Sequence, residues 1–255
     1  MKFDGIIFDW AGTTVDYGCF APVQAFIEVF KHFGVEPTME EVRKPMGMLK
    51  IDHIRTMLKM DRISRCWQEK YGKVPGEDEA QAMFNMFEEK LMSILDNFAD
   101  PKDGVVDTIK SLRDMGLKIG STTGYNDKMM SIVVPLAAKA GYAPDCWYSP
   151  DAVGQKGRPY PYMVFKNMET LGLGDVSRVL KVGDTVADIL EGKHAGVKTA
   201  GIIEGSSVMG LTKEEYEALS AEERKAADEK TEAAFKEVGA DYIIRNITEL
   251  LEIVK

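Results

Sequence analysis

The stretch FDGIIFDWAGTTVD, residues 3–16, sets the class of fold. Phe3 to Phe8 form a short apolar run with the length and composition of a buried strand, and the run ends at Asp9. The letters that follow, AGTTVD, are turn formers. The sequence therefore predicts a strand whose tip presents a carboxylate.

Further segments of the same kind recur along the chain, and helical patterns separate them. The predicted strands are Leu117–Thr122, Cys146–Tyr148, Arg178–Val182, Val197–Ile203 and Asp241–Ile244. The predicted helices are Asp103–Met115, Asp127–Ala140, Pro161–Leu171, Thr185–Ala195 and Ile247–Val254. Because strand and helix alternate, we expect an α/β fold with a doubly wound parallel sheet. Ligands of such sheets bind beyond the carboxyl ends of the strands, where Asp9, Thr123 and Asp184 fall.

Between Tyr17 and Phe98 the alternation stops, and helical patterns follow one another without a strand. We expect a catalytic core made of residues 1–17 and 99–255, with residues 18–98 inserted as a helical cap domain. The predicted cap helices are Pro22–Phe33, Met39–Arg43, Pro45–Leu58 and Asp78–Leu95. Two linkers, DYGCFAP and NFADPKDG, carry the breakers expected of hinges. The mixed charges of Thr212 to Lys236 indicate solvated helices.

Composition narrows the classes of partner. Of 255 residues, 45% are hydrophobic and 29% charged, the balance of a folded globular protein. A net charge of -9 gives no global attraction to nucleic acid or anionic lipid, and no apolar run approaches a membrane-spanning length. The 3 cysteines lack C-x-x-C spacing, which predicts neither a disulfide framework nor a zinc site. We expect a cytoplasmic protein that binds neither nucleic acid nor membrane.

The run VGDTVADI places Asp184 and Asp188 four residues apart, on one face at the start of a predicted helix. Capping of that helix by Asp184, with Asp188 as a first-turn acid, would explain both residues structurally. With Asp9 at a neighbouring strand end, however, the carboxylates would repel one another unless a hard cation lay between them. Carboxylate oxygens are ligands that suit Mg²⁺.

The run IGSTTGYND, after another apolar strand, gathers hydroxyl groups, a glycine and backbone amides where a phosphate oxygen could be held. Ordinary turn chemistry would produce the same letters. A cation for that phosphate could come from GQKGRPYPYM, in which Arg158 is preferred because a guanidinium can clamp two oxygens, and Lys156 is the alternative.

These motifs, in this order, resemble those of the haloacid dehalogenase superfamily, which includes phosphatases, dehalogenases and phosphonate hydrolases. The resemblance implies that Asp9 is the nucleophile that accepts a phosphoryl group and that Thr123 binds phosphate, while Gly124 allows close backbone approach. It also implies a Mg²⁺ site formed by Asp9, the backbone carbonyl of Ala11 and Asp184, with Asp188 as a further ligand or an orienting group.

Ala11 departs from the superfamily's pattern. Phosphatases of the superfamily usually carry a second Asp two residues after the nucleophile, which protonates the leaving oxygen, and here a methyl group occupies that place. The leaving group would then not be oxygen. Cleavage of a carbon–phosphorus bond expels a carbanion, and a lysine that condenses with a neighbouring aldehyde supplies an iminium to accept its electrons.

The predicted cap contains such a lysine. In KPMGMLKIDHIR, Pro45 can start a helix on which Lys50 and His53 share a face. Together with Ala11, Cys19 and STTGY, this run is similar to the phosphonoacetaldehyde hydrolase family, or phosphonatases, over nearly the full length. The resemblance implies that Lys50 forms the Schiff base. It also implies that the residues around the lysine are His53, Tyr125, Cys19 and Met46, and that the protein is a homodimer through the cap.

We therefore expect hydrolysis of phosphonoacetaldehyde to acetaldehyde and phosphate, through a Schiff base at Lys50 and an aspartyl phosphate at Asp9. His53 would handle the protons of imine formation. The alternatives are a phosphomonoesterase or phosphosugar mutase of the superfamily, a metal-independent dehalogenase, and a protein that only binds a phosphate ligand. Ala11 argues against the first, because no general acid remains.

Overall fold

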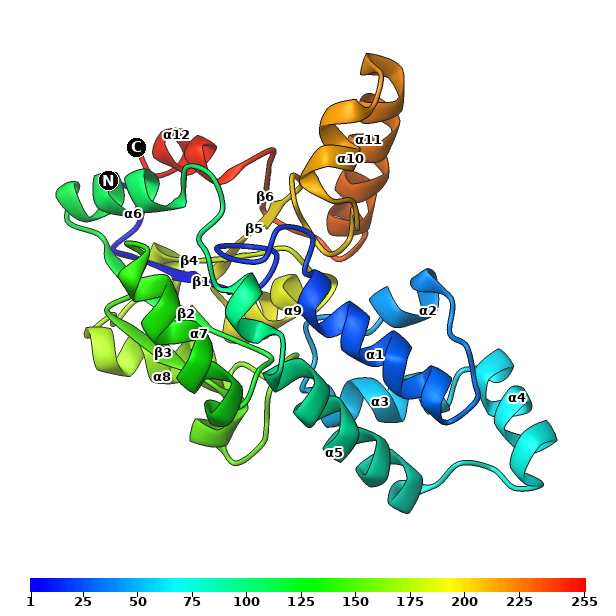
Figure 1. The fold of residues 1–255 in the computed structure, drawn as a ribbon. Coiled ribbons are helices and arrows are strands. Elements are labelled where there is room, and N and C mark those ends of the chain that lie inside the picture. The colour runs from blue at the N-terminus through cyan, green and yellow to red at the C-terminus, as the bar shows by residue number, and fades with distance from the viewer.

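The computed structural model describes residues 1–255 and places six parallel strands in the order β3-β2-β1-β4-β5-β6 (Figure 1). The strands are β1 (Gly5–Phe8), β2 (Lys118–Thr122), β3 (Cys146–Tyr148), β4 (Val179–Gly183), β5 (Lys198–Ile202) and β6 (Tyr242–Ile244). Phe8, the last residue of β1, is paired with Ser121 of β2 and with Val182 of β4. The carboxyl ends of these three neighbouring strands therefore lie level with one another.

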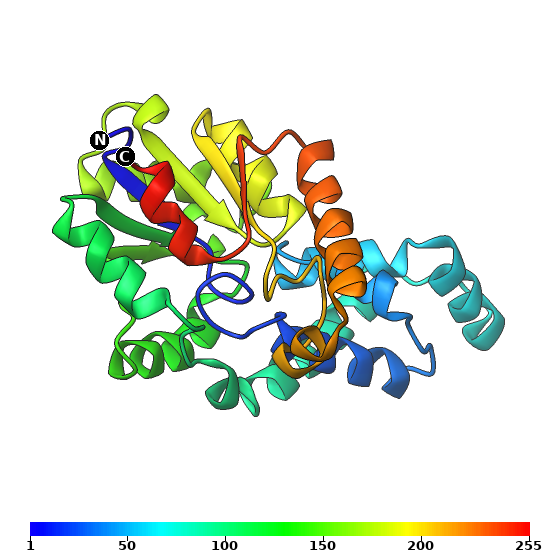
Figure 2. The ribbon, with the colours of Figure 1, turned by 90° about the horizontal axis from the view of Figure 1, so that it is seen from above.

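Helices of the core cover both faces of this sheet (Figure 2). They are α6 (Val105–Asp114), α7 (Asp127–Lys139), α8 (Tyr162–Leu171), α9 (Val186–Ala195) and α12 (Leu250–Ile253). Side chains alternate along β1: Ile6 and Phe8 join the larger apolar core, while Ile7 joins a smaller cluster with residues of α8 and α9. The expected α/β fold with a parallel sheet is confirmed, and all its predicted strands are present to within two residues at each end.

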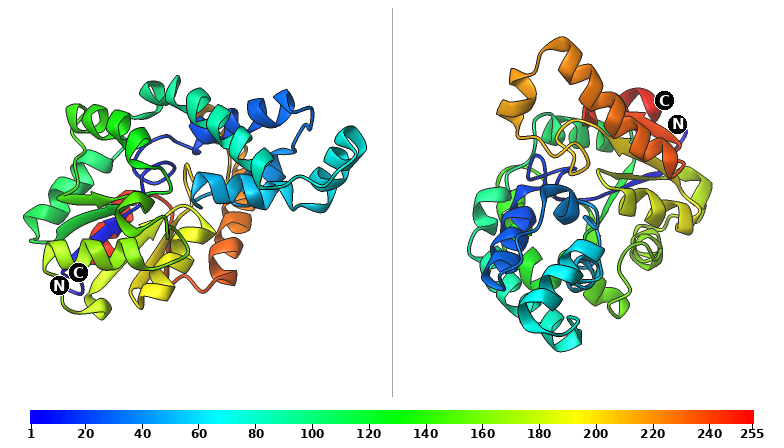
Figure 3. Two further views of the ribbon diagram at one scale, coloured as in Figure 1. Left: turned by 90° about the horizontal axis from the view of Figure 1, so that it is seen from below. Right: turned by 90° about the vertical axis from the view of Figure 1, so that its right-hand side faces the viewer.

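The long segment between β1 and β2 is entirely helical. Its elements are α1 (Phe20–His32), α2 (Met39–Arg43), α3 (Lys50–Leu58), α4 (Asp61–Tyr71), α5 (Glu77–Met92) and the 3-10 turn η1 (Leu95–Phe98). They form a group to one side of the sheet (Figures 1 and 3). This group buries apolar residues of its own, and the rings of Phe26 and Phe87 stack with centroids 4.2 Å apart, which joins α1 to α5.

The predicted start of one helix and the alternative that Asp184 caps another were wrong. The helix predicted from Pro45 begins only at Lys50, because residues 45–48 form a turn in which Gly47 adopts a left-handed φ of 88°. Asp184 does not lie in a helix either. Thr185 is the N-cap of α9, and its hydroxyl oxygen accepts a hydrogen bond from the Asp188 amide in a capping box.

The charged segment after β5 forms two helices, α10 (Lys213–Ala218) and α11 (Ala221–Glu237), which project beside the sheet (Figure 3). Their surfaces are mostly exposed, as predicted, but Phe235 of α11 is fully buried against Gly201 of β5, where a Cβ atom would come within 2.6 Å of its ring. No helix combines the length and the apolar character needed to cross a bilayer.

Asn167 of α8 fastens this helix to the centre of the sheet. Its side-chain oxygen accepts a hydrogen bond from the Ser121 amide (3.0 Å), and its amide group donates to the carbonyls of Ser121 and Met163 (2.9 Å each). Asn167→Ala should lower the free energy of unfolding by about 3 kcal/mol, since buried backbone groups lose their partners. Urea unfolding measures this loss. Asn85→Ala, on the exposed face of α5, is the control and should change stability little; equal effects of the two variants would contradict the assignment.

Candidate active site

Asp9 is held at the tip of β1 by its own backbone. Its amide donates to the carbonyl of Val182 (2.9 Å), which continues the ladder with β4, and its carbonyl accepts from the Thr14 hydroxyl (3.0 Å). The chain then turns sharply, because the amides of Thr13, Thr14 and Val15 all donate to the carbonyl of Trp10. The turn leaves the Asp9 side chain facing the carboxyl end of the sheet.

Three buried carboxylates meet at this point. One oxygen each of Asp9, Asp184 and Asp188 lies within 4.8 Å of the others. Thr13 bridges two of them, since its hydroxyl lies 3.2 Å from Asp184 Oδ1 and 3.4 Å from Asp9 Oδ2. The backbone also crowds the group, because Gly12 has a φ of 90° and a Cβ atom there would lie 2.0 Å from Asp184 Oδ2.

The electrostatics of this cluster suit a hard divalent cation. Burial and the charges of Asp9 and Asp188 raise the pKa of Asp184 well above its usual value; the charge of Lys102 lowers it only in part, and no lysine or arginine pairs directly with this carboxylate. An all-oxygen donor set of three acids is the kind that binds Mg²⁺. The residues present therefore fit a metal ion, which Asp9 and Asp184 would bind, with Asp188 as a further ligand or an orienting group.

Arg158 neutralises the opposite side of the cluster. Its Nη2 donates to Asp9 Oδ1 (2.6 Å) and lies 3.1 Å from Asp188 Oδ1, while its Nε donates to Glu191 Oε2 (2.9 Å). Burial alone would lower the pKa of Arg158, but these three carboxylates outweigh burial and raise it well above its usual value. Lys156, the alternative cation, is exposed, and its Nζ lies over the ring of Tyr162.

Lys181 of β4 completes this network of buried charges. Its Nζ lies 2.6 Å from Asp188 Oδ1 and 3.7 Å from Glu191 Oε2, and all three side chains are fully buried. Burial raises the pKa of Asp188, but Arg158 and Lys181 outweigh burial and lower it. Asp188 therefore carries its charge, and its second oxygen accepts from the Thr185 hydroxyl (2.6 Å).

The helical insert reaches this site through a tight backbone contact. A Cβ atom on Gly124 would lie 2.8 Å from the Met48 carbonyl and 2.9 Å from that of Gly47, and one on Gly47 would lie 2.4 Å from the Thr185 hydroxyl. Only glycine at these positions lets the two chains approach so closely. Beside them, the Thr123 hydroxyl oxygen accepts a hydrogen bond from the Tyr125 amide (3.0 Å).

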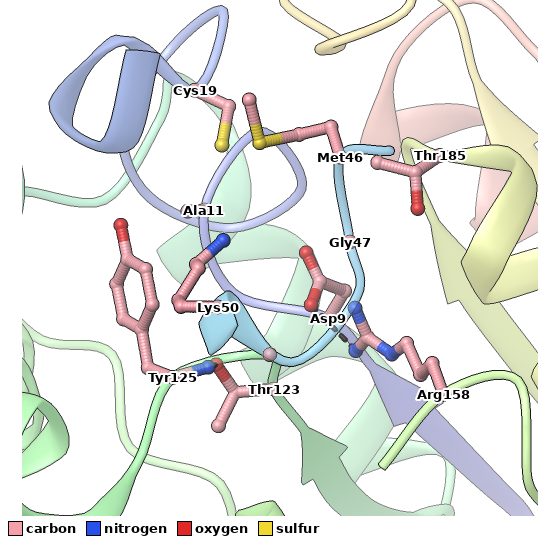
Figure 4. A pocket seen from close by; sticks show the side chains of 11 residues that line it. Asp9, Ala11, Cys19, Met46, Gly47, Lys50, Thr123, Tyr125, Arg158 and Thr185 are labelled. Carbon is pink, nitrogen blue, oxygen red and sulfur yellow. Dashed lines mark hydrogen bonds and ion pairs between the residues drawn. The ribbon is translucent and has the colours of Figure 1, made fainter. Parts of the chain in front are cut away.

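Lys50 is the first residue of α3 and is buried in the same pocket as Asp9 (Figure 4). Its Nζ lies 5.1 Å from the centre of the Tyr125 ring and 6.0 Å from that of Phe26. Burial lowers the pKa of Lys50, although nearby acids including Asp9 oppose the shift. The positive end of a helix dipole also disfavours an ammonium group at this position. The amine is therefore easier to deprotonate than an exposed lysine.

His53 lies one turn further along α3 and does not line the pocket. Its ring stacks on Phe26 with centroids 3.9 Å apart, and its Nε2 lies 2.8 Å from the carbonyl of Val42. A carbonyl only accepts, so Nε2 carries the proton and the buried Nδ1, which has no partner, keeps its lone pair. Burial and the charge of Lys50 hold the pKa of His53 well below its usual value, so the imidazole is neutral.

The remaining predicted residues also line the pocket. Cys19, in a left-handed conformation, lies with Met46 above the lysine (Figure 4), and Ala11 also lines the pocket. Burial raises the pKa of the Cys19 thiol well above its usual value, which keeps the thiol protonated. The cavity measures about 20 Å³, room for about one water molecule.

The family-model comparison matches residues 3–196 to the haloacid dehalogenase-like hydrolases. A protein of Lysinibacillus sphaericus named phosphonoacetaldehyde hydrolase is 51% identical over 98% of this chain and 93% of its own length. One of Bacillus cereus with the same name is 49% identical over the whole chain and 96% of its own length. This chain belongs to the phosphonoacetaldehyde hydrolase family of haloacid dehalogenase-like hydrolases.

A larger bifunctional protein and a solved structure are also similar to this chain. A bifunctional phosphonoacetaldehyde hydrolase/aminoethylphosphonate transaminase of Clostridioides difficile is 52% identical over 99% of this chain, which spans 40% of that protein. The crystal structure of a phosphonoacetaldehyde hydrolase-like protein of Oleispira antarctica has a TM-score of 0.96 at 34% identity, and the match covers 100% of this chain and 92% of that one. The membership explains the shared order of the motifs and makes the chain a hydrolase.

Sequence reasoning missed several residues that hold the site together. Lys181 and Glu191 were not singled out, and neither was Ser207, whose amide donates to Asp184 Oδ2 (2.7 Å). Two signals were available. A lysine lies inside the otherwise apolar strand VLKVG, and Glu191 follows Asp188 by three residues on the same helix. Ser207 gave no signal, because it acts through its backbone.

The buried ion pairs of Arg158 predict a metal-sensitive loss of stability. Arg158→Met should lower the free energy of unfolding by about 3–5 kcal/mol in EDTA, because Asp9, Asp188 and Glu191 lose their shared cation. Excess Mg²⁺ should restore part of that loss. Urea unfolding with and without Mg²⁺ measures both effects.

Arg178→Met is the matched control for this experiment. The Arg178–Asp4 pair has the same 2.6 Å separation, but its side chains are 41% and 51% exposed, so its loss should change stability little. A loss in Arg158→Met no larger than in this control would contradict the interpretation of the cluster.

Proposed function

We propose that this protein hydrolyses the carbon–phosphorus bond of phosphonoacetaldehyde, giving acetaldehyde and inorganic phosphate. One observation carries the proposal: a buried lysine and a buried carboxylate line the same pocket, with the methyl group of Ala11 where a general acid would be needed for an oxygen leaving group. The names of the relatives in the family support the same substrate.

In the first step, the neutral amine of Lys50 adds to the aldehyde carbon, and loss of water gives an iminium ion. Burial favours the neutral amine, and the ring of Tyr125 lies within reach of the cation that forms. The free Nδ1 lone pair of His53 is the proposed base for the proton transfers of this step, although His53 does not line the closed pocket and its lowered pKa makes it a weak base. Cys19 and Met46 enclose the aldehyde end of the substrate and exclude water from it.

In the second step, a carboxylate oxygen of Asp9 attacks phosphorus in line with the carbon. The phosphorus–oxygen bond forms as the phosphorus–carbon bond breaks, and the electron pair of the latter moves into the iminium to give a neutral enamine. Thr123 and Arg158 bind the phosphoryl oxygens. Mg²⁺, held by the three aspartates and the Ala11 carbonyl, would neutralise charge on the transferred group.

Two hydrolyses then regenerate the protein. Water attacks the aspartyl phosphate and releases inorganic phosphate, which returns Asp9 as a carboxylate. The enamine takes up a proton on carbon, and water hydrolyses the resulting iminium to acetaldehyde and the free amine of Lys50. No net oxidation occurs.

We further propose that residues 18–98 move as one cap on the core of residues 1–17 and 99–255. A cavity of about 20 Å³ admits about one water molecule, so a substrate with a phosphonate group requires the cap to open. We also propose a homodimer through the cap helices α1 and α5. The three free cysteines support action in a reducing compartment, the cytoplasm.

Trapping with borohydride tests the role of Lys50. Reduction in the presence of phosphonoacetaldehyde should convert the imine to a stable amine, adding one substrate-derived group at Lys50, located by peptide mass spectrometry. Lys50→Arg should give no adduct and no phosphate release, because a guanidinium does not condense with the aldehyde at neutral pH. Lys156→Arg, outside the pocket, is the matched control and should behave as the unmodified protein. Full turnover by Lys50→Arg would overturn the proposal and leave a phosphatase or dehalogenase.

Asp9→Asn should separate the two chemical steps. The amide cannot attack phosphorus, so phosphate release should fall by at least about a thousandfold, while borohydride still labels Lys50. Coupled assays of phosphate and acetaldehyde, run beside the trapping experiment, measure the two steps. Loss of trapping in a folded Asp9→Asn variant would show that Asp9 is needed for imine formation and would refute this division of roles.

A further inference from the structure

Arg43, at the end of α2, contacts the first linker of the insert and a loop of the core. Its Nη1 donates to the carbonyl of Gly18, in the first linker (2.9 Å), and to the carbonyl of Ser207, in the loop after β5 (3.1 Å). The guanidinium also lies over the ring of Phe20, with its central carbon 4.8 Å from the ring centre. One side chain thus joins the insert, its hinge and the core.

This placement is poor for stability alone. Burial lowers the pKa of Arg43, and its Nε and Nη2 have no hydrogen-bond partner. No carboxylate pairs with it directly, and the nitrogen that does bond reaches only carbonyl oxygens. A partly buried cation with unsatisfied donors costs free energy, which favours a role beyond holding the fold together.

The loop that Arg43 contacts also donates a hydrogen bond to Asp184, a predicted metal ligand at the end of β4. The amide of Ser207 donates to Asp184 Oδ2 (2.7 Å), and the carbonyl of the same residue accepts from Arg43. Ser207 is therefore the single residue that links the Arg43 guanidinium to the Asp184 carboxylate. The guanidinium of Arg43 also packs closely against Gly210, where a Cβ atom would lie 2.7 Å from Arg43 Nε.

On the insert side, the same helix positions Lys50. The carbonyl of Val42, next to Arg43 in α2, accepts the hydrogen bond of His53 in α3, whose first residue is Lys50. Since His53 is fully buried, α2 and α3 are locked together at this point. Movement of α2 against the loop after β5 would therefore move the lysine as well.

We infer that Arg43 is a positioning residue that couples the closed insert to the metal carboxylates. When the insert is seated, Arg43 orders the loop at Ser207, whose amide orients Asp184, so that Lys50 and the metal site are assembled together. When the insert lifts, that bond is lost and Asp184 loses its orienting contact. The inference rests on the proposed role of Asp184 in binding Mg²⁺.

The test is the affinity for Mg²⁺ of the full chain without substrate, measured by calorimetry. Arg43→Met keeps an apolar stem over Phe20 but removes the donors, and it should weaken Mg²⁺ binding roughly tenfold, the effect of one hydrogen bond to a charged group. Arg43→Lys keeps a donor and should recover part of the affinity. Arg62→Met is the control, because Arg62 pairs with Glu41 within the insert and makes no contact with the loop after β5.

A second variant approaches the same contact from the core. Gly210→Ala places a methyl group against Arg43, and Gly154→Ala adds the same strain at a left-handed glycine with open space around it. Gly210→Ala alone should weaken Mg²⁺ binding, and the double variant Arg43→Met/Gly210→Ala should be no weaker than Arg43→Met, because both act through one contact. Thermal unfolding of each variant shows which variants are folded, and Mg²⁺ affinities are compared only among those. If Arg43→Met is unstable, Gly210→Ala still tests the contact.

Unchanged Mg²⁺ affinity in both Arg43→Met and Gly210→Ala would overturn the coupling while leaving the proposed reaction intact. Equal weakening by Arg62→Met or Gly154→Ala would overturn it too, because the effect would then be general destabilisation. Absence of Mg²⁺ binding by the unmodified chain would overturn both the coupling and the metal role. Failure of the unmodified chain to cleave phosphonoacetaldehyde, with Mg²⁺ binding coupled to Arg43, would overturn only the proposed substrate.

Discussion

The site depends on one electrostatic constraint: four carboxylates are buried together at the ends of β1 and β4. Asp9, Asp184, Asp188 and Glu191 are all excluded from water, and buried like charges repel strongly. Arg158 and Lys181 form ion pairs with Asp9, Asp188 and Glu191 and so compensate the charges of these three carboxylates. Asp184 is left with a hydroxyl, a backbone amide and no cation within ion-pair distance, which is the property expected of a metal ligand.

A second constraint comes from the division of the site between two parts of the chain. Asp9, Thr123 and Arg158 come from the ends of strands or the loops that follow them, whereas Met46, Gly47 and Lys50 come from the insert. The two sets meet only because Gly47 and Gly124 lack side chains where the backbones touch. The proposed chemistry needs that contact, since the amine and the nucleophile must hold the two ends of one small substrate.

Ala11 connects this geometry to the kind of bond that is broken. A carboxylic acid at this position would protonate an oxygen leaving group, and its absence removes that route. In the proposed mechanism, the buried lysine across the pocket replaces proton donation by electron withdrawal. Ala11 and Lys50 would together account for the departure from phosphatase chemistry, while Asp9, Thr123 and Arg158 would keep the superfamily's phosphoryl-transfer role.

The sequence by itself determined the class of fold and the place of Asp9, Thr123 and Asp184 at strand ends, because alternation of strands and helices is local information. Lys50 was also found from sequence, through the resemblance of its motif to a known family. The sequence did not place the start of α3, since the left-handed turn at Gly47 follows from the contact of the insert with the core. Nor did it show Glu191, Lys181, Ser207 and Arg43 as parts of the site. Their roles come from burial and from backbone contacts between residues up to 164 positions apart, which only the tertiary structure brings together.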